Sequence, residues 1–389
     1  MTDADTRPTH DVLARRDGAL GHLTLNRPAA HNALTLDMVR TIDAALDLWE
    51  EDPGVAAVLV DGAGDRAFCA GGDIRALYDA RRAGLHAPLA DFFRLEYRLN
   101  ARIARYPKPI VTVMHGMTMG GGIGLGAHAS HRIVTERSAL AMPEVRIGFA
   151  PDVGGTYLLG RAPGELGLHL ALTGGRAGPA DALLCGLADV HVPAGRLHDL
   201  RTALAGCRTA ADVDARLSAF GTAPAPGGLD AARGWIDRCY GFDAVEDILA
   251  ALEAAPEAEA RAAAAEIAGN APTSLKVTLQ ALRDARLLGL EDCLDREFRV
   301  SLSITARPDF VEGVRAAVVD KDRAPRWQPA RLSDVSRRDV LRHFEPAEDG
   351  DLGLGKPSWA GPRTSASPHG GEERDGVAGA SPSRSGDDA

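Results

Sequence analysis

Two carboxylates stand out in the sequence by their type, spacing and surroundings. Glu144 and Asp152 lie eight positions apart in the stretch AMPEVRIGFAPDVGGTY, and a proline directly precedes each of them. Small or apolar neighbours favour raised carboxyl pKa values and separate roles for two nearby acids in acid–base or nucleophilic chemistry. The alternative is that Glu144 is an ordinary loop acid and that Asp152 only caps a helix beginning near Val153.

Two glycine-rich turns form a second chemical feature. The strand-like PIVTVMHG leads to Gly120-Gly121-Gly122 and the helix-like IGLGAHA, and FCAGGDIR repeats the arrangement with a helix expected after Asp73. The first N–H groups of a helix have no partner within it, so each turn can present a donor to developing negative charge. If the turns converge on one oxyanion, each donor contributes about 2.7–4 kcal/mol of transition-state stabilisation. Taken alone, a triple glycine is more often only a tight turn.

The same glycines also match a different class of site. Gly122-x-Gly124-x-x-Ala127 fits the relaxed dinucleotide fingerprint, with Glu144 about twenty residues further on. However, the run follows a complete hairpin and a strand–helix unit, and an NAD site would explain neither FCAGGDIR nor APDVGGTY. We keep the dinucleotide site as the enzyme alternative from another class.

The elements that must position these residues follow from the hydrophobic pattern. DVLARR and ALGHLTLN predict a hairpin around Asp17-Gly18, and a helix is expected from about residue 35 to 50. VAAVLVDG and PIVTVMHG predict buried strands with helical sequence between them, which implies a parallel sheet. From about residue 160 the pattern is almost wholly helical, as in DILAALEAAPEAEARAAAAEIAG. The fold class is therefore α/β, with a helical layer in the second half.

Composition limits the classes of protein. A chain of 389 residues with 45% hydrophobic content can cover a large core, and a net charge of −10 argues against general nucleic-acid binding. The five cysteines are scattered without a CxxC pair, so we expect a reducing compartment and no metal site. The N-terminus lacks an apolar leader and carries Asp3 and Asp5, and no stretch is long enough to span a membrane, so we predict a cytoplasmic location.

Seven motifs in order carry a family resemblance: NRPAAHNAL, FCAGGDIR, EYRLN, HGMTMGGGIGLG, AMPEVRIGFAPDVGGTY, APTSLK and DFVEGVRAAVVDKDRAPRW. From about residue 12 to residue 330 the chain resembles the enoyl-CoA hydratase/isomerase (crotonase) superfamily, and within it the 3-hydroxyisobutyryl-CoA hydrolase branch. The resemblance implies a spiral of ββα units followed by a C-terminal helical layer. It also implies an acyl-CoA substrate and a possible homo-oligomer.

The domain boundaries follow from this resemblance and from composition. We predict a flexible N-terminus at residues 1–10, a ββα core at 11–205 and a C-terminal helical region at 206–345. Residues 346–389 are dense in Gly, Ser, Pro and charge, and such a segment cannot bury enough apolar area to offset its ordering entropy. We predict that this tail is disordered.

The resemblance also assigns the site. It implies that Gly72 and Gly121 donate to the oxyanion, that Glu144 and Asp152 are the catalytic acids, and that Glu96 of EYRLN lines the acyl pocket. Gly121, Glu144 and Asp152 would bind substrate together with Glu96. The alternative for Glu96 is a solvated surface charge paired with a neighbouring arginine, Arg94 or Arg98. No separate cofactor is expected, because coenzyme A is part of the substrate, and no metal is expected. The candidate contacts for the CoA phosphates are Arg27, Arg75 and Lys108. His115 and His128 suit core roles better than ligand roles.

One departure from the family pattern favours hydrolysis over hydration. Hydratases carry two catalytic glutamates, but Gly124 stands where the first would be, and Asp152 stands where a hydratase usually has glycine. The expected reaction is hydrolysis of a short 3-hydroxyacyl-CoA, 3-hydroxyisobutyryl-CoA to 3-hydroxyisobutyrate and CoA, as in valine degradation. Glu144 would either activate water or attack the thioester directly, and the sequence leaves both routes open. The alternatives are an enoyl-CoA hydratase/isomerase and a catalytically silent acyl-CoA-binding module.

Overall fold

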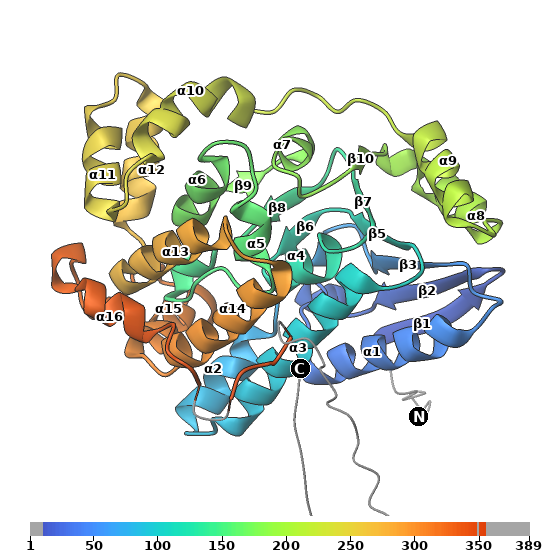
Figure 1. Ribbon diagram of the computed structural model, residues 1–389, viewed down its shortest axis with the longest axis horizontal. Coiled ribbons are helices and arrows are strands. Elements are labelled where there is room, and N and C mark those ends of the chain that lie inside the picture. The colour runs from blue at the N-terminus through green and yellow to red at the C-terminus, as the bar shows by residue number, and fades with distance from the viewer. Residues whose placement is uncertain (1–10, 348–349, 355–389) are drawn as a thin grey trace, which may run out of the picture. The chain divides into compact units, whose positions relative to one another are not determined.

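A mixed sheet forms the N-terminal layer of the computed structural model, which describes residues 11–347 and 350–354 (Figure 1). Within these residues the sheet has six strands in the order β1-β2-β3-β5-β7-β10, and every neighbouring pair except β1 and β2 is parallel. The strands are β1 (Val12–Asp17), β2 (Leu20–Leu25), β3 (Ala57–Gly62), β5 (Ile110–Met114), β7 (His131–Val134) and β10 (Val190–His191).

The first hairpin and the parallel pairing confirm the prediction from the hydrophobic pattern. Asp17 pairs with Leu20 across a tight turn in which Gly18 has φ +66°, a conformation that glycine adopts at little cost. The apolar strands β3 and β5 are buried and lie side by side in parallel. Parallel strands are covered on both faces, which explains why their sequences run as continuous apolar stretches.

A second, smaller sheet was not predicted. Among the described residues it has four strands in the order β4-β6-β8-β9: β4 (Ala67–Cys69), β6 (Met117–Met119), β8 (Ala139–Ala141) and β9 (Arg176–Ala177). Strands of two or three residues are too short to show a period of two in the sequence. The glycine turn at residues 120–122 therefore follows β6 and not, as expected, the strand PIVTVMHG.

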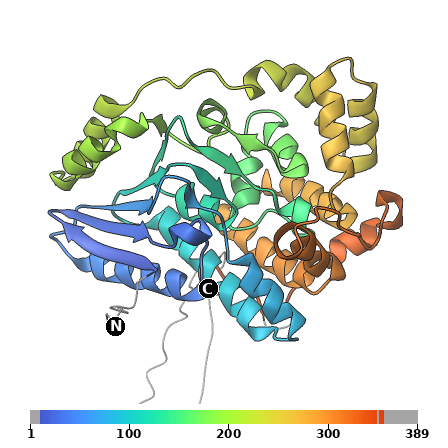
Figure 2. The same cartoon turned by 180° about the vertical axis from the view of Figure 1, so that it is seen from behind.

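Helices cover both faces of the six-stranded sheet. On one face Leu200 of α8 (Leu197–Ala205) and Val213 of α9 (Ala210–Phe220) bury the strand residues Leu59, Val111 and Ile133. The other face packs against the main core, to which α1 and α3 contribute, and Figure 2 shows the arrangement from behind. The helices before the C-terminal region are α1 (Leu36–Glu51), α2 (Ile74–Arg82), α3 (Ala87–Arg105), α4 (Gly121–Gly126), α5 (Gly155–Leu159), α6 (Leu166–Thr173), α7 (Pro179–Leu184) and α8 (Leu197–Ala205).

The C-terminal region is helical, as predicted. The alanine-rich segment at residues 247–269 is divided into α11 and α12 by Pro256, which cannot continue a helix. Further on, α14 packs against α3, where the rings of Tyr97 and Phe298 meet edge to face with centroids 6.4 Å apart. The helices are α9 (Ala210–Phe220), α10 (Leu229–Tyr240), α11 (Val245–Ala254), α12 (Ala258–Ala268), α13 (Pro272–Ala285), α14 (Leu290–Thr305), α15 (Pro308–Val314) and α16 (Arg337–Arg342).

The predicted tail begins later than residue 345. Asp351 is ion-paired with Arg299 of α14, with 2.7 Å between Nε and Oδ1, and Leu352 is 5% exposed. Packing thus continues past the predicted boundary, because an acid and a leucine find partners on α14 and α3. The predicted flexible segment at residues 1–10 and the predicted disorder at 348–349 and 355–389 concern residues outside the described part of the chain.

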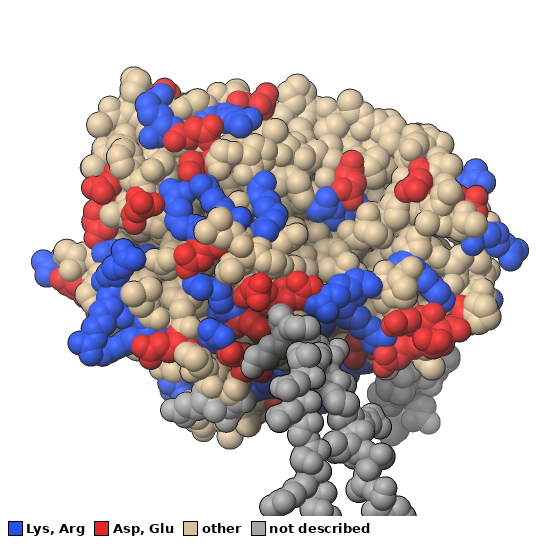
Figure 3. Space-filling model, in the orientation of Figure 1, with Lys and Arg blue, Asp and Glu red and all other residues tan. Residues whose placement is uncertain are grey.

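The length and polarity of the helices and the charges on the surface bear on possible membrane and nucleic-acid contacts. In the part of the chain that the structure describes, no helix combines the length and apolarity needed to cross a bilayer. On the face drawn in Figure 3, acidic and basic side chains lie among one another.

Candidate active site

A cavity of about 450 Å³ lies where the two glycine turns, α3 and the acidic stretch meet. Its walls are largely apolar, with Phe92, Phe93 and Phe149 among the lining side chains. Glu96, Glu144 and Asp152 also line it. The structure therefore brings together residues that the sequence nominated from positions between 72 and 152, and their roles stay predictions.

The two glycine turns converge at this cavity. A methyl group built on Gly121 would lie 3.3 Å from the backbone nitrogen of Gly72, and one built on Gly71 would lie 3.6 Å from the nitrogen of Gly121. Within the described residues, neither the Gly72 N–H nor the Gly121 N–H has an acceptor. Two adjacent N–H groups without acceptors beside a cavity have the geometry that an oxyanion hole needs.

Two carboxylates that line the cavity each have one oxygen without a hydrogen-bond partner among the described residues. Glu96 and Glu144 are 2% and 6% exposed, and among the described residues Glu96 Oε1 and Glu144 Oε2 have no hydrogen-bond partner. The interpretation of Glu96 as a solvated surface charge is wrong, because its side chain is buried. Arg94 lies over the ring of Phe298, with 4.8 Å between its guanidinium carbon and the ring centroid, and Arg98 donates to the Leu352 carbonyl. Buried polar atoms without partners are rare, and here they point to an occupant that the cavity is shaped to receive.

Burial and mutual repulsion set the charge of the acids. Burial, followed by the charge of Asp152, raises the pKa of Glu96 and of Glu144 well above the ordinary value. Burial also raises the pKa of Asp152, to about 7, although a hydrogen bond from Tyr97 opposes it. All three acids thus have raised pKa values, and the charge of Asp152 adds to the effect of burial on the other two.

Asp152 is not a helix cap. Its Oδ2 accepts the hydroxyl of Tyr97 at 2.6 Å, and the Tyr97 oxygen lies 2.6 Å from Ser301 Oγ. Helix α5 begins only at Gly155, and its N-cap residue Gly154 has no side chain to cap with. The local interpretation of Asp152 as a cap fails because a tyrosine from α3 takes up its carboxylate.

The chain reverses direction directly after this acid. The Gly155 N–H donates to the Asp152 carbonyl at 2.6 Å, and the two central residues have positive φ, +53° at Val153 and +77° at Gly154. This is the geometry of a type I′ turn, which asparagine and glycine favour. A β-branched residue at positive φ is strained by about 1–3 kcal/mol, and the surrounding structure must hold it there.

Sequence reasoning missed the residues that support this turn and its acid. They are Tyr97, Ser301 and Glu297, together with Thr156, whose N–H and hydroxyl both donate to Glu297. A signal existed for two of them, because Glu297 and Ser301 are four positions apart and buried on the same face of α14. An acid and a hydroxyl on the apolar face of a helix require partners, and that requirement could have marked them.

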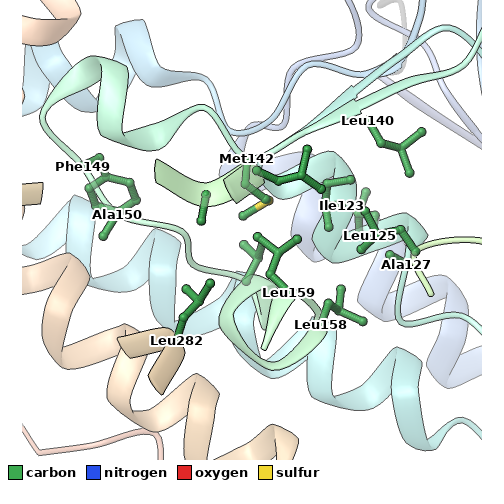
Figure 4. Close-up of a cluster of buried hydrophobic side chains, with 14 of the residues drawn as sticks. Ile123, Leu125, Ala127, Leu140, Met142, Phe149, Ala150, Leu158, Leu159 and Leu282 are labelled. Carbon is green, nitrogen blue, oxygen red and sulfur yellow. The ribbon is translucent and has the colours of Figure 1, made fainter. Parts of the chain in front are cut away.

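The space next to Gly124, where a hydratase would carry its first catalytic glutamate, is occupied by other side chains. A methyl group built on Gly124 would lie 2.7 Å from Val153 Cβ and 2.8 Å from Asn100 Nδ2. Both distances are shorter than real Cβ contacts, so no side chain fits at residue 124 without movement of α3 or of the Val153 turn. Helix α4 and its surroundings form part of the apolar core drawn in Figure 4, in which Ile123 and Leu125 pack near Met142.

The cations suggested for the CoA phosphates are engaged elsewhere. Arg27 donates to Asp73 and to the Ala33 carbonyl, Arg75 pairs with Asp79, and Lys108 donates to the carbonyls of Trp49 and Asp52. The arginines that do line the cavity are Arg146 and Arg176. Sequence gave no signal for them, because their proximity depends on how β9 meets the acidic stretch.

The described histidine, cysteine and acidic side chains bear on metal binding and thiol chemistry. In residues 11–347 and 350–354, no group of three or more His, Cys, Asp or Glu side chains is arranged to hold a metal ion. All five cysteines are free and buried. His128 has a satisfied core role, since Nε2 lies 2.7 Å from the Val153 carbonyl, and His115 Nδ1 lies 2.9 Å from Thr135 Oγ1.

The known proteins that this chain resembles belong to one family, but they are named for different reactions. A family model described as enoyl-CoA hydratase/isomerase matches residues 20–344. The rat mitochondrial 3-hydroxyisobutyryl-CoA hydrolase is 41% identical over 88% of this chain and 91% of its own length, and the human one is 38% identical over 89% and 92%. A crystal structure described as a carnitinyl-CoA dehydratase from Mycobacterium thermoresistibile has 48% identity and a TM-score of 0.84, covering 88% of this chain and 98% of its own. One described as an enoyl-CoA hydratase from Rhodobacter sphaeroides 2.4.1 has 46% identity and a TM-score of 0.82, covering 88% and 99%.

The predicted cytoplasmic location is contradicted by these relatives. The rat, zebrafish and human proteins are all named as mitochondrial. The prediction depended on the composition of the first residues, and residues 1–10 lie outside the described part of the chain.

Proposed function

The chain belongs to the enoyl-CoA hydratase/isomerase family, and on that basis we propose that it hydrolyses 3-hydroxyisobutyryl-CoA to 3-hydroxyisobutyrate and CoA. The observation that carries the proposal is the buried pair Glu144 and Asp152, which shares a cavity with the N–H groups of Gly72 and Gly121. The curated relatives at 38–41% identity support the choice of substrate by their names.

The N–H pair would act on the thioester carbonyl. As a nucleophile adds to the carbonyl carbon, negative charge grows on its oxygen, and donors without other acceptors stabilise that charge more than they stabilise the ground state. The glycines contribute by having no side chain, because a methyl group on Gly121 would fill the space between the donors and Glu96.

Glu144 would supply the nucleophile in one of two ways. As a general base it removes a proton from water, whose oxygen then adds to the carbonyl carbon and expels CoA thiolate. As a nucleophile its carboxylate expels CoA thiolate itself, leaving a mixed anhydride that water hydrolyses. Both routes require ionised Glu144, so its raised pKa predicts that activity increases with pH above the ordinary range of a glutamate.

Asp152 and Glu96 would orient the acyl group. Tyr97 holds Oδ2 of Asp152, which fixes the carboxylate toward the cavity, where it would accept the substrate hydroxyl or relay a proton to the leaving thiolate. Glu96, which lies beside Gly121, would form the opposite wall of the acyl site. The reaction needs no separate cofactor, since coenzyme A enters as part of the substrate.

Hydration of an enoyl-CoA is the second candidate, because the solved structures at 46–48% identity are described as a hydratase and a dehydratase. Water addition across a double bond in this family uses two glutamates. The first would have to stand at residue 124, where Val153 and Asn100 leave no room for a side chain. The geometry therefore favours hydrolysis.

The test is thiol release from 3-hydroxyisobutyryl-CoA, run beside hydration of crotonyl-CoA and with a chelator present. We expect thiol release by the wild type and a loss of kcat of about 10³-fold or more in Glu144→Gln and Asp152→Asn, the scale for losing a catalytic acid or base. Glu253→Gln, which changes an exposed acid on α11, is the matched control and should keep wild-type activity. Hydration of crotonyl-CoA without thiol release would contradict the proposal, and so would full activity in both acid variants.

A further inference from the structure

The turn that carries Asp152 is held in a conformation its sequence does not favour. Asparagine or glycine normally occupies the first central position of such a turn, but here it is Val153, at φ +53°. Because Asp152 is the residue directly before this strained position, any relaxation of the turn would re-aim its carboxylate. Something outside the turn must therefore keep it closed.

Glu297 of α14 holds the turn from one side. It is 3% exposed, its Oε2 accepts the Gly154 N–H at 2.6 Å, and its Oε1 accepts the Thr156 N–H at 2.9 Å as well as the Thr156 hydroxyl. The two N–H partners can only donate, so both oxygens must accept, whereas the Thr156 hydroxyl can donate to the carboxylate or accept from the protonated acid. Burial raises the pKa of Glu297 to about 8 against these hydrogen bonds.

His128 holds the turn from the other side. Its Nε2 lies 2.7 Å from the Val153 carbonyl, and because that partner is an acceptor, Nε2 must carry the hydrogen. Burial lowers the pKa of His128 to about 4, so the ring is neutral at neutral pH. A methyl group built on Gly154 would clash with this ring, which shows how closely the imidazole covers the turn.

We propose that Glu297 and His128 are positioning residues that clamp the strained turn between them and so aim Asp152 at the substrate. The inference rests on the proposed function, in which Asp152 acts on the acyl group. It assigns the C-terminal helical layer a part in catalysis, because the hydroxyl partner of Tyr97, Ser301, lies one helical turn from Glu297 on α14.

The proposal is tested first by kinetics. In Glu297→Gln the amide can accept at only one atom, so we expect kcat to fall about 10- to 100-fold, the scale of a misplacement near 1 Å, with KM changed less than about threefold. The titratable groups that face Glu297 are Asp152, Glu144 and Cys293. Above about pH 8, where Glu297 is ionised, its charge raises the pKa of Glu144, so Glu297→Gln should move this part of the acid limb of the pH profile to lower pH.

His128 gives an internal contrast. His128→Leu should lower kcat to a similar degree, but it should leave the acid limb unmoved, because the neutral ring contributes no charge. His128→Gln, which can still donate to the Val153 carbonyl, should restore most of the activity. Thr305→Val is the control, because it removes a buried hydroxyl on α14, the helix that also carries Glu297, and this hydroxyl donates to the Ser301 carbonyl. We expect its kcat to stay within about twofold of the wild type, as for a substitution that leaves the reacting groups in place.

Hydrogen exchange of the full-length protein decides the proposal independently of activity. The peptide spanning residues 152–158 should exchange faster in Glu297→Gln and His128→Leu than in the wild type or Thr305→Val, because the Gly154 and Thr156 amides lose their protection. Exchange, kcat and pH profile of Glu297→Gln that match Thr305→Val would overturn the clamp. A wild type that releases no thiol would refute the proposed function alone, and the exchange result would still decide for or against the clamp.

Discussion

The glycine turns on the two sides of the cavity differ in what becomes of their N–H groups. At Gly72 and Gly121 the described residues offer no acceptor to the N–H groups, and both glycines line the cavity. In the turn after Asp152, the Gly154 N–H is bound by Glu297 and the Gly155 N–H by the Asp152 carbonyl. Glycine thus serves two purposes here: it exposes backbone donors on one side and fixes a side chain on the other.

The difference has a physical cause. A buried donor without an acceptor costs about 1–3 kcal/mol, so it is retained only where something gains from it, such as a substrate oxygen. An N–H that already donates within the protein is not available to a substrate oxygen, but its hydrogen bond makes the backbone rigid. The first kind of turn marks where charge would develop, and the second marks which side chain must not move.

Closing the open donors should give the largest effect. In Gly121→Ala the added methyl would clash with Glu96, would lie 3.1 Å from Leu34 and would stand 3.3 Å from the Gly72 nitrogen. We expect kcat for thiol release to fall about 10²- to 10³-fold, the loss seen when an oxyanion donor is removed. Gly195→Ala, with nothing within 4 Å of the new methyl, is the control. Near-normal turnover in Gly121→Ala would show that this turn plays no part in the reaction.

Disturbing the satisfied turn should give an intermediate effect. Gly154→Ala places a methyl against His128 at φ +77°, so we expect a loss of about 1–3 kcal/mol in the free energy of unfolding. As Asp152 shifts with the turn, kcat should also fall about 10- to 100-fold. Urea denaturation and steady-state kinetics measure both quantities, with Gly234→Ala of α10, which meets no neighbour, as the reference. A loss of stability with unchanged kcat would separate the turn from catalysis.

Removing the hydroxyl that holds Asp152 should give the smallest effect and a change in pH dependence. Tyr97 donates to the Asp152 carboxylate and thereby lowers its pKa, so in Tyr97→Phe that pKa should rise above about 7 and the inflection set by Asp152 should move to higher pH. We expect kcat to fall about tenfold, as for loss of one hydrogen bond to a charged group. Tyr78→Phe, another buried tyrosine, serves as the matched control. An inflection that stays in place or moves to lower pH would exclude Tyr97 as the partner that sets the charge of Asp152.

The sequence predicted what depends on near neighbours. The hairpin at Gly18, the helix from Leu36 and the parallel pair of strands were recognisable because turn chemistry, capping by Thr35 and apolar runs act within a few residues. The short strands of the second sheet were missed, because strands of two or three residues have no period to detect. Their pairing depends on the surrounding fold.

The sequence by itself determined the α/β class, the two glycine turns and the acids Glu144 and Asp152, because each lies in a motif whose meaning is local. Only the tertiary structure decided that Asp152 bonds to Tyr97 rather than caps a helix, and that Glu297 supports its turn. These contacts join residues 55 and 143 positions apart. Burial, which raises the carboxyl pKa values, likewise depends on how α3 and α14 pack, and no local pattern encodes that packing.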